Sequence, residues 1–253
     1  MENHLDSIAI SNLSIHYKKQ QVLKDVNLRL QKGGIHVLVG PNGSGKTSLL
    51  NALSGEISYS GSILLEGKEQ QKLSKNELAQ TLSMVHSTNA VHHIQVEEFI
   101  RLARFPYTNF LGRLSETDKE IIHKGIQLVG IEELLSKSVD ELSDGERKKV
   151  MIAAALAQDC PIMLMDEPTT FLDIGNKFLF SKLLQQMKLE LGKTLVISTH
   201  DLDLVFQVAD SVLLIQDQHI EQHSVQEVRD QKLIEKTFEA YHLQLDANGK
   251  LIL

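Results

Sequence analysis

Gly40-Pro41-Asn42-Gly43-Ser44-Gly45-Lys46-Thr47 is the stretch of this sequence that decides its fold. The residues before it, Ile35-His36-Val37-Leu38-Val39, form an apolar run typical of a buried strand. The residues after it, Ser48-Leu49-Leu50-Asn51-Ala52-Leu53, have the apolar spacing of a helix. We therefore predict a strand, a glycine-rich loop and a helix in succession.

The glycine-rich loop has the composition of a phosphate-binding loop, or P-loop. Its three glycines allow the backbone to wrap around an anion, toward which successive N–H groups and the helix N-terminus converge. Lys46 adds a positive charge for the β- and γ-phosphates, and the Thr47 hydroxyl is a candidate Mg²⁺ ligand. We expect a nucleoside triphosphate, bound by the whole loop together with Ser48. The alternative is a chance glycine-rich turn.

Size, charge and cysteine content limit the class of protein. At 253 residues the chain can form one domain with a large core. It has 33 acidic and 26 basic residues, a net charge of −7, and no long Lys/Arg block, which argues against a nucleic-acid or anionic-membrane surface. The one cysteine, Cys160, fits a reducing compartment, and we expect a buried, unreactive thiol. We find no secretory signal and no apolar run long enough to span a membrane.

The hydrophobic pattern changes twice along the chain. Apolar and polar residues alternate in the runs 8–10, 13–17 and 26–30, which is typical of strands with one solvated face. Between 88 and 158 the periodicity is helical, with helices predicted at 96–103, 115–129 and 145–158. Strands and helices then alternate, with strands at 162–165, 194–198 and 211–215 and helices at 174–191 and 201–209. An Asn-Gly pair at 248–249 predicts a C-terminal hairpin.

Two adjacent carboxylates, Asp166 and Glu167, follow the apolar run 162–165. In a nucleotide hydrolase, Asp166 would lie beside the P-loop and help to hold Mg²⁺. Glu167 would reach a water in line with the γ-phosphate. The alternative is that both residues only cap the next helix.

A second anion-binding pattern, Leu142-Ser143-Asp144-Gly145-Glu146, stands at the start of the predicted helix 145–158. Ser143, Gly145 and the positive end of the helix dipole would form an anion site separate from the P-loop. Alone, the pattern would be an ordinary helix N-cap. Two phosphate-binding groups in one chain suggest that a nucleotide is shared between two copies.

In this order, the motifs resemble those of the ATP-binding subunits of ABC transporters over almost the whole chain. Residues 40–47 are similar to the Walker A motif, 142–146 to the signature motif, 162–167 to the Walker B motif and 170–173 to the D-loop. The resemblance implies an α/β fold of the P-loop NTPase (RecA-like) type, with a mixed sheet core, an antiparallel β subdomain and an inserted α-helical subdomain. We expect a single domain, with residues 1–87 and 159–253 as the core and 88–158 as the helical insert.

The resemblance also implies ligands and roles for single residues. ATP and Mg²⁺ are the expected cofactors, and Lys46, Thr47 and Asp166 belong to their site. Glu167 would be the catalytic base, His200 would contact the γ-phosphate, and Tyr17 would stack on adenine. Ser143, Gly145 and Glu146 would act on the ATP that the other protomer holds.

The chain departs from the family pattern at two positions. After the strand 82–85, where the family has a glutamine, this chain has His86-Ser87, with Gln95 later in the same segment. We expect Ser87 to make a weakened or water-mediated metal contact, so that hydrolysis depends more on the partner. Equal ATPase rates with and without the partner, in wild type and Ser87→Gln alike, would refute this hypothesis. Asp144 replaces a glycine of the signature motif, and we expect little effect.

Within the family, the segment Arg104-Phe105-Pro106-Tyr107 resembles importers of iron-siderophores, haem and cobalamin. The resemblance implies a groove over residues 87–107 that receives a permease helix, with Arg101, Arg104 and Tyr107 as contact candidates. The expected assembly is a homodimer on polytopic permease subunits at the cytoplasmic side of the membrane, served indirectly by a substrate-binding protein. A soluble ABC-type ATPase and an ATP-gated assembly module with weak hydrolysis remain the alternatives.

Overall fold

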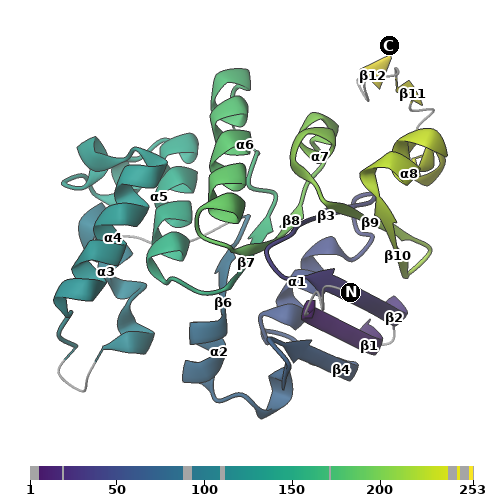
Figure 1. The fold of residues 1–253 in the computed structure, drawn as a ribbon, viewed down its shortest axis with the longest axis horizontal. Coiled ribbons are helices and arrows are strands. Elements are labelled where there is room, and N and C mark those ends of the chain that lie inside the picture. Colours follow the sequence, from purple (N-terminus) through teal and green to yellow (C-terminus); the bar gives the residue numbers. More distant parts are fainter. Residues whose placement is uncertain are drawn as a thin grey trace.

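The computed structural model describes residues 6–18, 20–87, 93–108, 112–170, 172–238, 244–245 and 251–252. A six-stranded sheet runs through the middle of the molecule (Figure 1). Its strands, in order across the sheet, are β10 (His219–Ser224), β9 (Ser211–Gln216), β3 (Ile35–Val39), β8 (Thr194–Ser198), β7 (Ile162–Asp166) and β6 (Leu82–Val85). Neighbouring strands are parallel, except β9 and β10. All residues of β3, β7 and β8 are buried, because helices or a second sheet cover both faces.

A second, antiparallel sheet lies beside the first. It has the order β2 (Gln20–Gln31), β1 (Asp6–Tyr17), β4 (Ser60–Leu65) and β5 (Lys68–Glu69). The runs 8–10 and 13–17, which the sequence indicated as separate, belong to one strand. The register shifts between Ile10 and Leu13, and Asn12 has φ +50°, so β1 bends at a bulge without ending.

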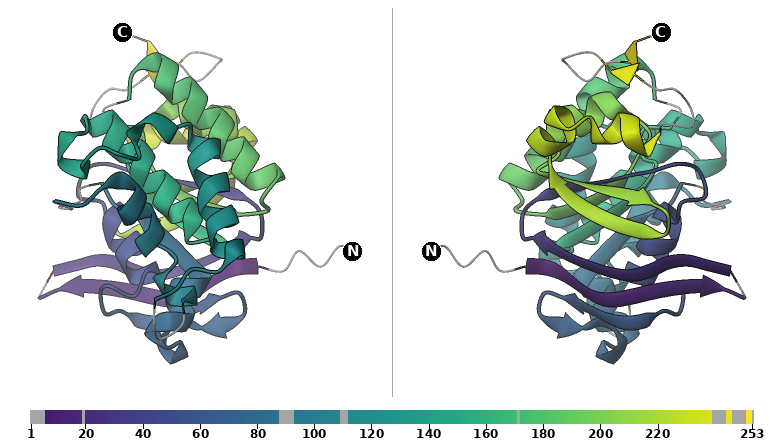
Figure 2. Two further views of the ribbon diagram at one scale, coloured as in Figure 1. Left: turned by 90° about the vertical axis from the view of Figure 1, so that its left-hand side faces the viewer. Right: turned by 90° about the vertical axis from the view of Figure 1, so that its right-hand side faces the viewer.

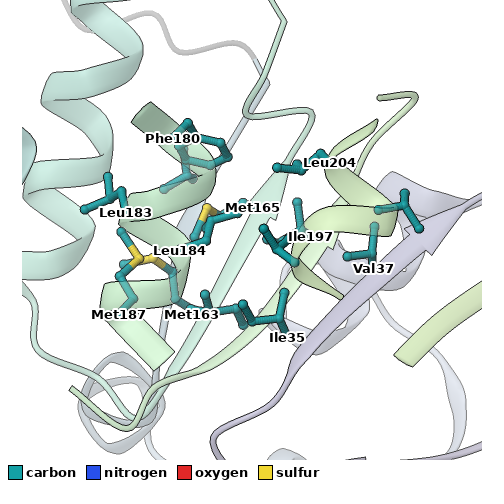
Figure 3. Packing of buried hydrophobic residues seen from close by; sticks show 14 of the residues in the cluster. Ile35, Val37, Met163, Met165, Phe180, Leu183, Leu184, Met187, Ile197 and Leu204 are labelled. Atoms are coloured by element: carbon teal, nitrogen blue, oxygen red, sulfur yellow. The ribbon is translucent and has the colours of Figure 1, made fainter. Parts of the chain in front are cut away.

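Hydrophobic side chains pack on both faces of the central sheet. On one face they meet α6 (Ile174–Leu189) and α7 (Leu202–Val208), as Figure 3 shows for Met163 and Met165 against Leu184 and Met187. On the other face, α1 (Lys46–Leu53) buries Leu49 in a cluster shared with both sheets. The glycine-rich loop that precedes α1 is therefore anchored between two sheets.

Three helices form a separate group at one end of the molecule. They are α3 (Val96–Leu102), α4 (Glu116–Val129) and α5 (Asp144–Ala157), and they share their own hydrophobic cluster. The two side views of Figure 2 place this group and the β9–β10 pair at opposite ends. Helix α5 joins the group to the sheet, because Ile152 and Leu156 pack in the cluster of α6 while Val150 and Ala153 pack with α3 and α4. The exact boundaries 88 and 158 for a helical subdomain stay a prediction.

The remaining elements are a helix before β6 and the segment that follows β10. Helix α2 (Lys75–Thr81) begins with the capping box of Ser74 and Glu77, and α8 (Val225–Asp230) and α9 (Leu233–Thr237) follow β10. The expected C-terminal hairpin is present as the antiparallel pair β11 (Gln244–Leu245) and β12 (Leu251–Ile252), although its Asn-Gly turn lies outside the described residues. Among the described residues, no helix combines the length and apolarity that a membrane span requires.

Candidate active site

The loop between β3 and α1 requires glycine at two positions. Gly45 has φ +110°, and a Cβ atom there would lie 2.9 Å from Val22 Cγ1. A Cβ atom on Gly40 would lie 2.8 Å from Ser44 Oγ. Helix α1 begins at Lys46, directly after Gly45, so its first N–H groups open into the loop. The loop has the form that the sequence predicted.

Lys46 and Thr47 connect this loop to the end of β7. The Lys46 ammonium donates hydrogen bonds to the carbonyl oxygens of Gly40 (2.8 Å) and Pro41 (3.1 Å) and is only 7% exposed. Burial lowers the pKa of Lys46, while the charges of Glu167 and Asp166 oppose that shift. The Thr47 hydroxyl donates a hydrogen bond of 2.9 Å to Asp166 Oδ2.

The two carboxylates at the end of β7 are held in different ways. Asp166 is 2% exposed and accepts a hydrogen bond of 2.5 Å from the Ser198 hydroxyl on the neighbouring strand β8. Glu167 has φ +48°, a left-handed conformation that is uncommon for this residue type. Its N–H donates to Ser198, and its Oε1 atom lies 2.9 Å from His200 Nε2 without the alignment of a hydrogen bond.

The polar atoms at this edge of the sheet fit the phosphates and metal of a nucleotide. Ser44 Oγ and Glu167 Oε1 are buried and have no hydrogen-bond partner in the described part of the chain. Such groups cost free energy unless a ligand satisfies them. The hydroxyl of Thr47 and the carboxylate of Asp166 are oxygen ligands of the kind that Mg²⁺ prefers.

Ser143 is the N-cap of α5 and forms a capping box with Glu146. Its hydroxyl accepts from the Glu146 N–H and donates to Glu146 Oε2 at 2.7 Å. These hydrogen bonds, with a further one from Lys137, lower the pKa of Glu146 to about 2. The Glu146 carboxylate therefore orients Ser143 at the start of α5. Ser143 is exposed and lies in the helical group, whereas Lys46 starts α1 between the two sheets.

Tyr17 is the last residue of β1. Its side chain is 47% exposed, and it pairs with Gln20 at the start of β2. The same strand β2 carries Val22, which touches the position of Gly45. A half-exposed aromatic ring at this turn has the free face that stacking on a base requires.

The segment after β6 contains one contact that the sequence did not reveal. Ser87 is exposed in a bend. Gln95 lies at the N-cap of α3, where it lines a groove on the helical group that does not include Ser87. The carbonyl oxygen of His86 accepts a hydrogen bond of 3.0 Å from the ammonium of Lys148 in α5. Lys148 occupies the buried face of α5, one turn before Ile152. A lysine at an apolar helical position was the signal that could have identified it.

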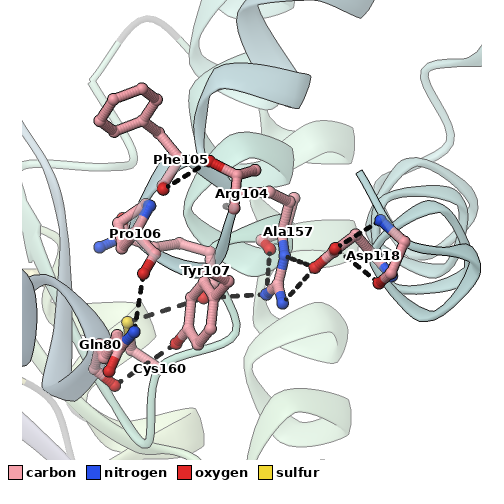
Figure 4. A network of polar contacts seen from close by, with 11 residues as sticks. Gln80, Arg104, Phe105, Pro106, Tyr107, Asp118, Ala157 and Cys160 are labelled. Atoms are coloured by element: carbon pink, nitrogen blue, oxygen red, sulfur yellow. Dashed lines mark hydrogen bonds and ion pairs between the residues drawn. The ribbon is translucent and has the colours of Figure 1, made fainter. Parts of the chain in front are cut away.

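Arg104 is an internal residue, and its expected contact with a partner is wrong. The guanidinium is 4% exposed, forms an ion pair of 2.8 Å with Asp118, and donates to the carbonyl oxygen of Ala157 (Figure 4). It also lies 3.9 Å from the ring centre of Tyr107, which is partly buried. Of the three contact candidates, Arg101 lines a groove on the helical group.

Cys160, just before β7, belongs to the same network of polar contacts (Figure 4). Its thiol donates to the carbonyl oxygen of Ala79, and burial raises its pKa to about 11. The side chain is 1% exposed, as the sequence analysis expected for an unreactive cysteine.

Comparisons with known proteins agree with this architecture. The family described as "ABC transporter" matches residues 23–170. The chain belongs to the ABC transporter family. An uncharacterised ABC transporter ATP-binding protein of Methanocaldococcus jannaschii is 37% identical over 212 residues, which are 83% of this chain and 73% of the relative. The iron(3+)-hydroxamate import ATP-binding protein of Bacillus subtilis is 34% identical and is matched over 79% of this chain and 75% of its own length.

Solved structures of ABC proteins share the fold. A subunit of a Clostridium perfringens ABC transporter complex superposes with a TM-score of 0.78 at 27% identity, covering 93% of this chain and 95% of that one. A nucleotide-free ABC transporter cassette superposes with a TM-score of 0.81 at 22% identity, covering 94% and 99%. The ABC chain described here is an ATP-binding ATPase with the α/β P-loop NTPase fold that the sequence predicted.

Proposed function

We propose that this ABC protein is the ATP-hydrolysing subunit of an importer, and that two copies enclose two Mg-ATP between them to drive transport. The observation that carries the proposal is the convergence of five side chains at one edge of the central sheet. They come from the P-loop, the end of β7 and the end of β8, and they are Lys46, Thr47, Asp166, Glu167 and His200.

Each of these side chains has a role that its environment favours. Lys46, a buried cation at the start of α1, binds the β- and γ-phosphates, and the loop 40–48 surrounds them with N–H groups. Thr47 and Asp166, already within hydrogen-bond distance of each other, hold Mg²⁺, which neutralises phosphate charge when bound.

Glu167 and His200 are the candidates for the hydrolytic step. The Oε1 atom of Glu167, which has no hydrogen-bond partner among the described residues, can accept a hydrogen bond from a water molecule and orient it for attack on the γ-phosphate. The ring of His200, 2.9 Å from that oxygen, can hold the carboxylate or contact the γ-phosphate. Ser87 is the proposed residue for a water-mediated metal contact, because its exposed position after β6 leaves room for a bridging water.

Ser143 and Gly145 act on the nucleotide of the second copy. They lie at the exposed N-terminus of α5, a helix of 14 residues whose positive end favours an anion. This end belongs to the helical group, whereas the P-loop lies between the two sheets, so a shared nucleotide accounts for both. Glu146 supports the site by capping, and Tyr17 stacks on the adenine held by its own chain.

A groove on the helical group is the proposed contact for the permease. Its volume is about 510 Å³, and it is lined by Gln95, Glu97, Glu98, Arg101, Leu102, Phe105, Thr108, Gly112 and Leu114. Leu102 and Phe105 are 54% and 71% exposed there, next to two carboxylates. Exposed apolar side chains beside charged ones suit a short amphipathic helix of a partner.

The imported ligand belongs to the iron-siderophore, haem or cobalamin class. Relatives support this assignment, including the iron(3+)-hydroxamate protein and the ferric enterobactin transport ATP-binding protein of Escherichia coli, 32% identical over 229 residues. The importer assignment sets the location at the cytoplasmic face of the membrane, on polytopic permease subunits and, through them, a substrate-binding protein.

Copurification with the permease tests the function and the groove together. We expect the wild-type chain to hydrolyse ATP and to copurify with a polytopic membrane protein that imports an iron chelate. Leu102→Ser should reduce recovery of the complex about tenfold, because it removes an apolar contact in the groove. Leu189→Ser is the matched control, since Leu189 is 75% exposed at the end of α6, outside the groove. Equal losses in both variants, or no membrane partner for the wild type, would contradict the proposal.

A further inference from the structure

A buried lysine outside the P-loop, Lys148, is not among the residues of the proposed nucleotide site. Lys148 lies in the second turn of α5, is 5% exposed, and donates its hydrogen bond to the His86 carbonyl oxygen at 3.0 Å. A buried ammonium costs free energy unless negative groups compensate for the lost water. A lysine at a buried helical position therefore needs negative groups nearby.

The compensating charges are those of the active site. Burial lowers the pKa of Lys148, and the carboxylates of Asp166 and Glu167 oppose that shift. The same two carboxylates act in the same way on Lys46. The charges of one pair of carboxylates therefore act on two buried lysines, one from α1 and one from α5.

Helix α5 also carries the second phosphate-binding group. Ser143 caps this helix five residues before Lys148, a separation of about 7.5 Å along the axis. A rigid helix thus connects the contact at His86 to the exposed hydroxyl at its start. His86 is held from its other side as well, because its ring lies 3.2 Å from Glu56 Oε1 beyond the end of α1.

We propose that Lys148 is a positioning residue, which fixes α5 and its N-terminal Ser143 relative to the Asp166–Glu167 edge. The hydrogen bond to His86 sets the distance between the helical group and the loop after β6. The charge of the ammonium keeps that end of α5 against the carboxylates. The inference rests on the proposed function, since it requires that Ser143 binds the nucleotide of a second copy.

Three variants separate this role from simple packing. Lys148→Met keeps the length of the side chain and removes its charge and its donor. Lys148→Arg keeps a cation and N–H donors. Lys149→Met makes the same change at the next position of α5, where the side chain is partly exposed.

We expect Lys148→Met to lower kcat about 30-fold, the size of effect that a small misplacement of a binding group produces. Lys148→Arg should retain at least about a third of the wild-type kcat, and Lys149→Met should match wild type. The thermal unfolding temperature of Lys148→Met should stay within about 3 °C of wild type, because losing a buried charge offsets losing the hydrogen bond to His86, and Lys46 still acts on the two carboxylates. A lysine that only supported packing would lose stability together with activity.

The second measurement does not depend on turnover. In a Glu167→Gln background, we would record the ATP concentration at which half of the protein becomes dimeric, with Mg²⁺ present. Adding Lys148→Met should raise this ATP concentration about tenfold, and adding Lys149→Met should leave it unchanged. The affinity of dilute, monomeric protein for a fluorescent ATP analogue should stay within about twofold, because the P-loop is intact.

Two outcomes would overturn the inference. The first is a Lys148→Met protein with wild-type kcat and an unchanged dimerisation midpoint. The second is a Lys149→Met protein with the same losses, since the effect would then belong to the helix surface. If Glu167→Gln alone does not dimerise, the proposed function fails, and the kcat comparison alone decides whether Lys148 positions the active site.

Discussion

Glu167 combines a strained backbone with an unsatisfied side-chain oxygen. Its φ of +48° costs on the order of 1 kcal/mol for a residue other than glycine, and its buried Oε1 atom has no hydrogen-bond partner in the described residues. Such costs are typical of residues that a binding or catalytic site holds in place.

Replacing Glu167 should therefore separate stability from activity. We expect Glu167→Gly to raise the free energy of unfolding by about 1 kcal/mol, because glycine adopts this φ without strain and the variant no longer buries an oxygen that lacks a hydrogen bond. ATP hydrolysis should fall at least about 100-fold. Urea unfolding and phosphate release measure the two effects, with Glu167→Gln as the control that keeps the strained backbone. A Glu167→Gly protein less stable than Glu167→Gln would be evidence against strain at this residue.

The aromatic ring of Tyr17 can be tested in the same way. If it stacks on adenine, Tyr17→Ala should weaken ATP binding about tenfold, within the range of about 1–3 kcal/mol measured for a stacked base. Tyr17→Phe should bind like wild type, since it keeps the ring and removes only the hydroxyl. Titration with a fluorescent ATP analogue gives both constants. Equal affinity in the alanine variant would mean that the exposed ring has no part in nucleotide binding.

Among the helices, the start of α4 depends on a buried ion pair. Asp118 caps that helix with Ser115 and pairs with Arg104, which also binds the end of α5 (Figure 4). The hydrogen bond from Ser115 is the main cause that lowers the pKa of Asp118 below its ordinary 3.8, with Arg104 adding to it. The folded protein therefore releases this proton more readily than the unfolded chain does.

The stabilising effect of Asp118 should disappear in acid. It is fully present above pH 3.8 and is lost as the pH falls through the lower folded pKa. We expect Asp118→Asn to be about 3 kcal/mol less stable than wild type at pH 7, since it leaves the Arg104 charge unpaired. The difference in free energy of unfolding between the two proteins should become smaller below pH 3.8. Urea unfolding at several pH values measures it, and a gap that stayed constant down to pH 2 would refute the assignment.

Local patterns predicted the elements whose residues are buried or capped in a regular way. The strands 162–165 and 194–198 were predicted within one residue, because every position is apolar or buried. Strand β10 was missed, since Ile220 is its one fully buried residue. Helix α8 was missed although Ser224 and Glu227 form a capping box, a signal that its six residues made easy to overlook.

Contacts between segments that are distant in the sequence decided how many of the site's contacts could be predicted. The order of motifs predicted that Thr47 and Asp166, far apart in sequence, would meet, and their hydrogen bond confirms it. No local pattern shows that the guanidinium of Arg104 meets Asp118, so its burial could not be predicted. Lys148 escaped notice for a similar reason, because its partner is a main-chain carbonyl 62 residues away.

At the scale of the whole molecule, helix α5 joins the parts on which the account depends. Its residues pack both with α6 on the central sheet and with α3 and α4 in the helical group. Ser143 caps its first turn, and its second turn carries Lys148, whose pKa responds to the charges of Asp166 and Glu167. A partner in the groove of α3 would therefore contact a group of helices that is directly connected to the proposed site of ATP hydrolysis.

The central claim is that two chains grip two nucleotides, each held by Lys46 of one chain and Ser143 of the other. The most direct measurement is the mass in solution of Glu167→Gln, which we expect to bind ATP without hydrolysing it, by light scattering with and without Mg-ATP. The account predicts 28.4 kDa without the nucleotide and twice that mass with it. It also predicts that Ser143→Arg in the same background prevents the change. A Glu167→Gln protein that stays monomeric at high concentration with saturating Mg-ATP would contradict the claim.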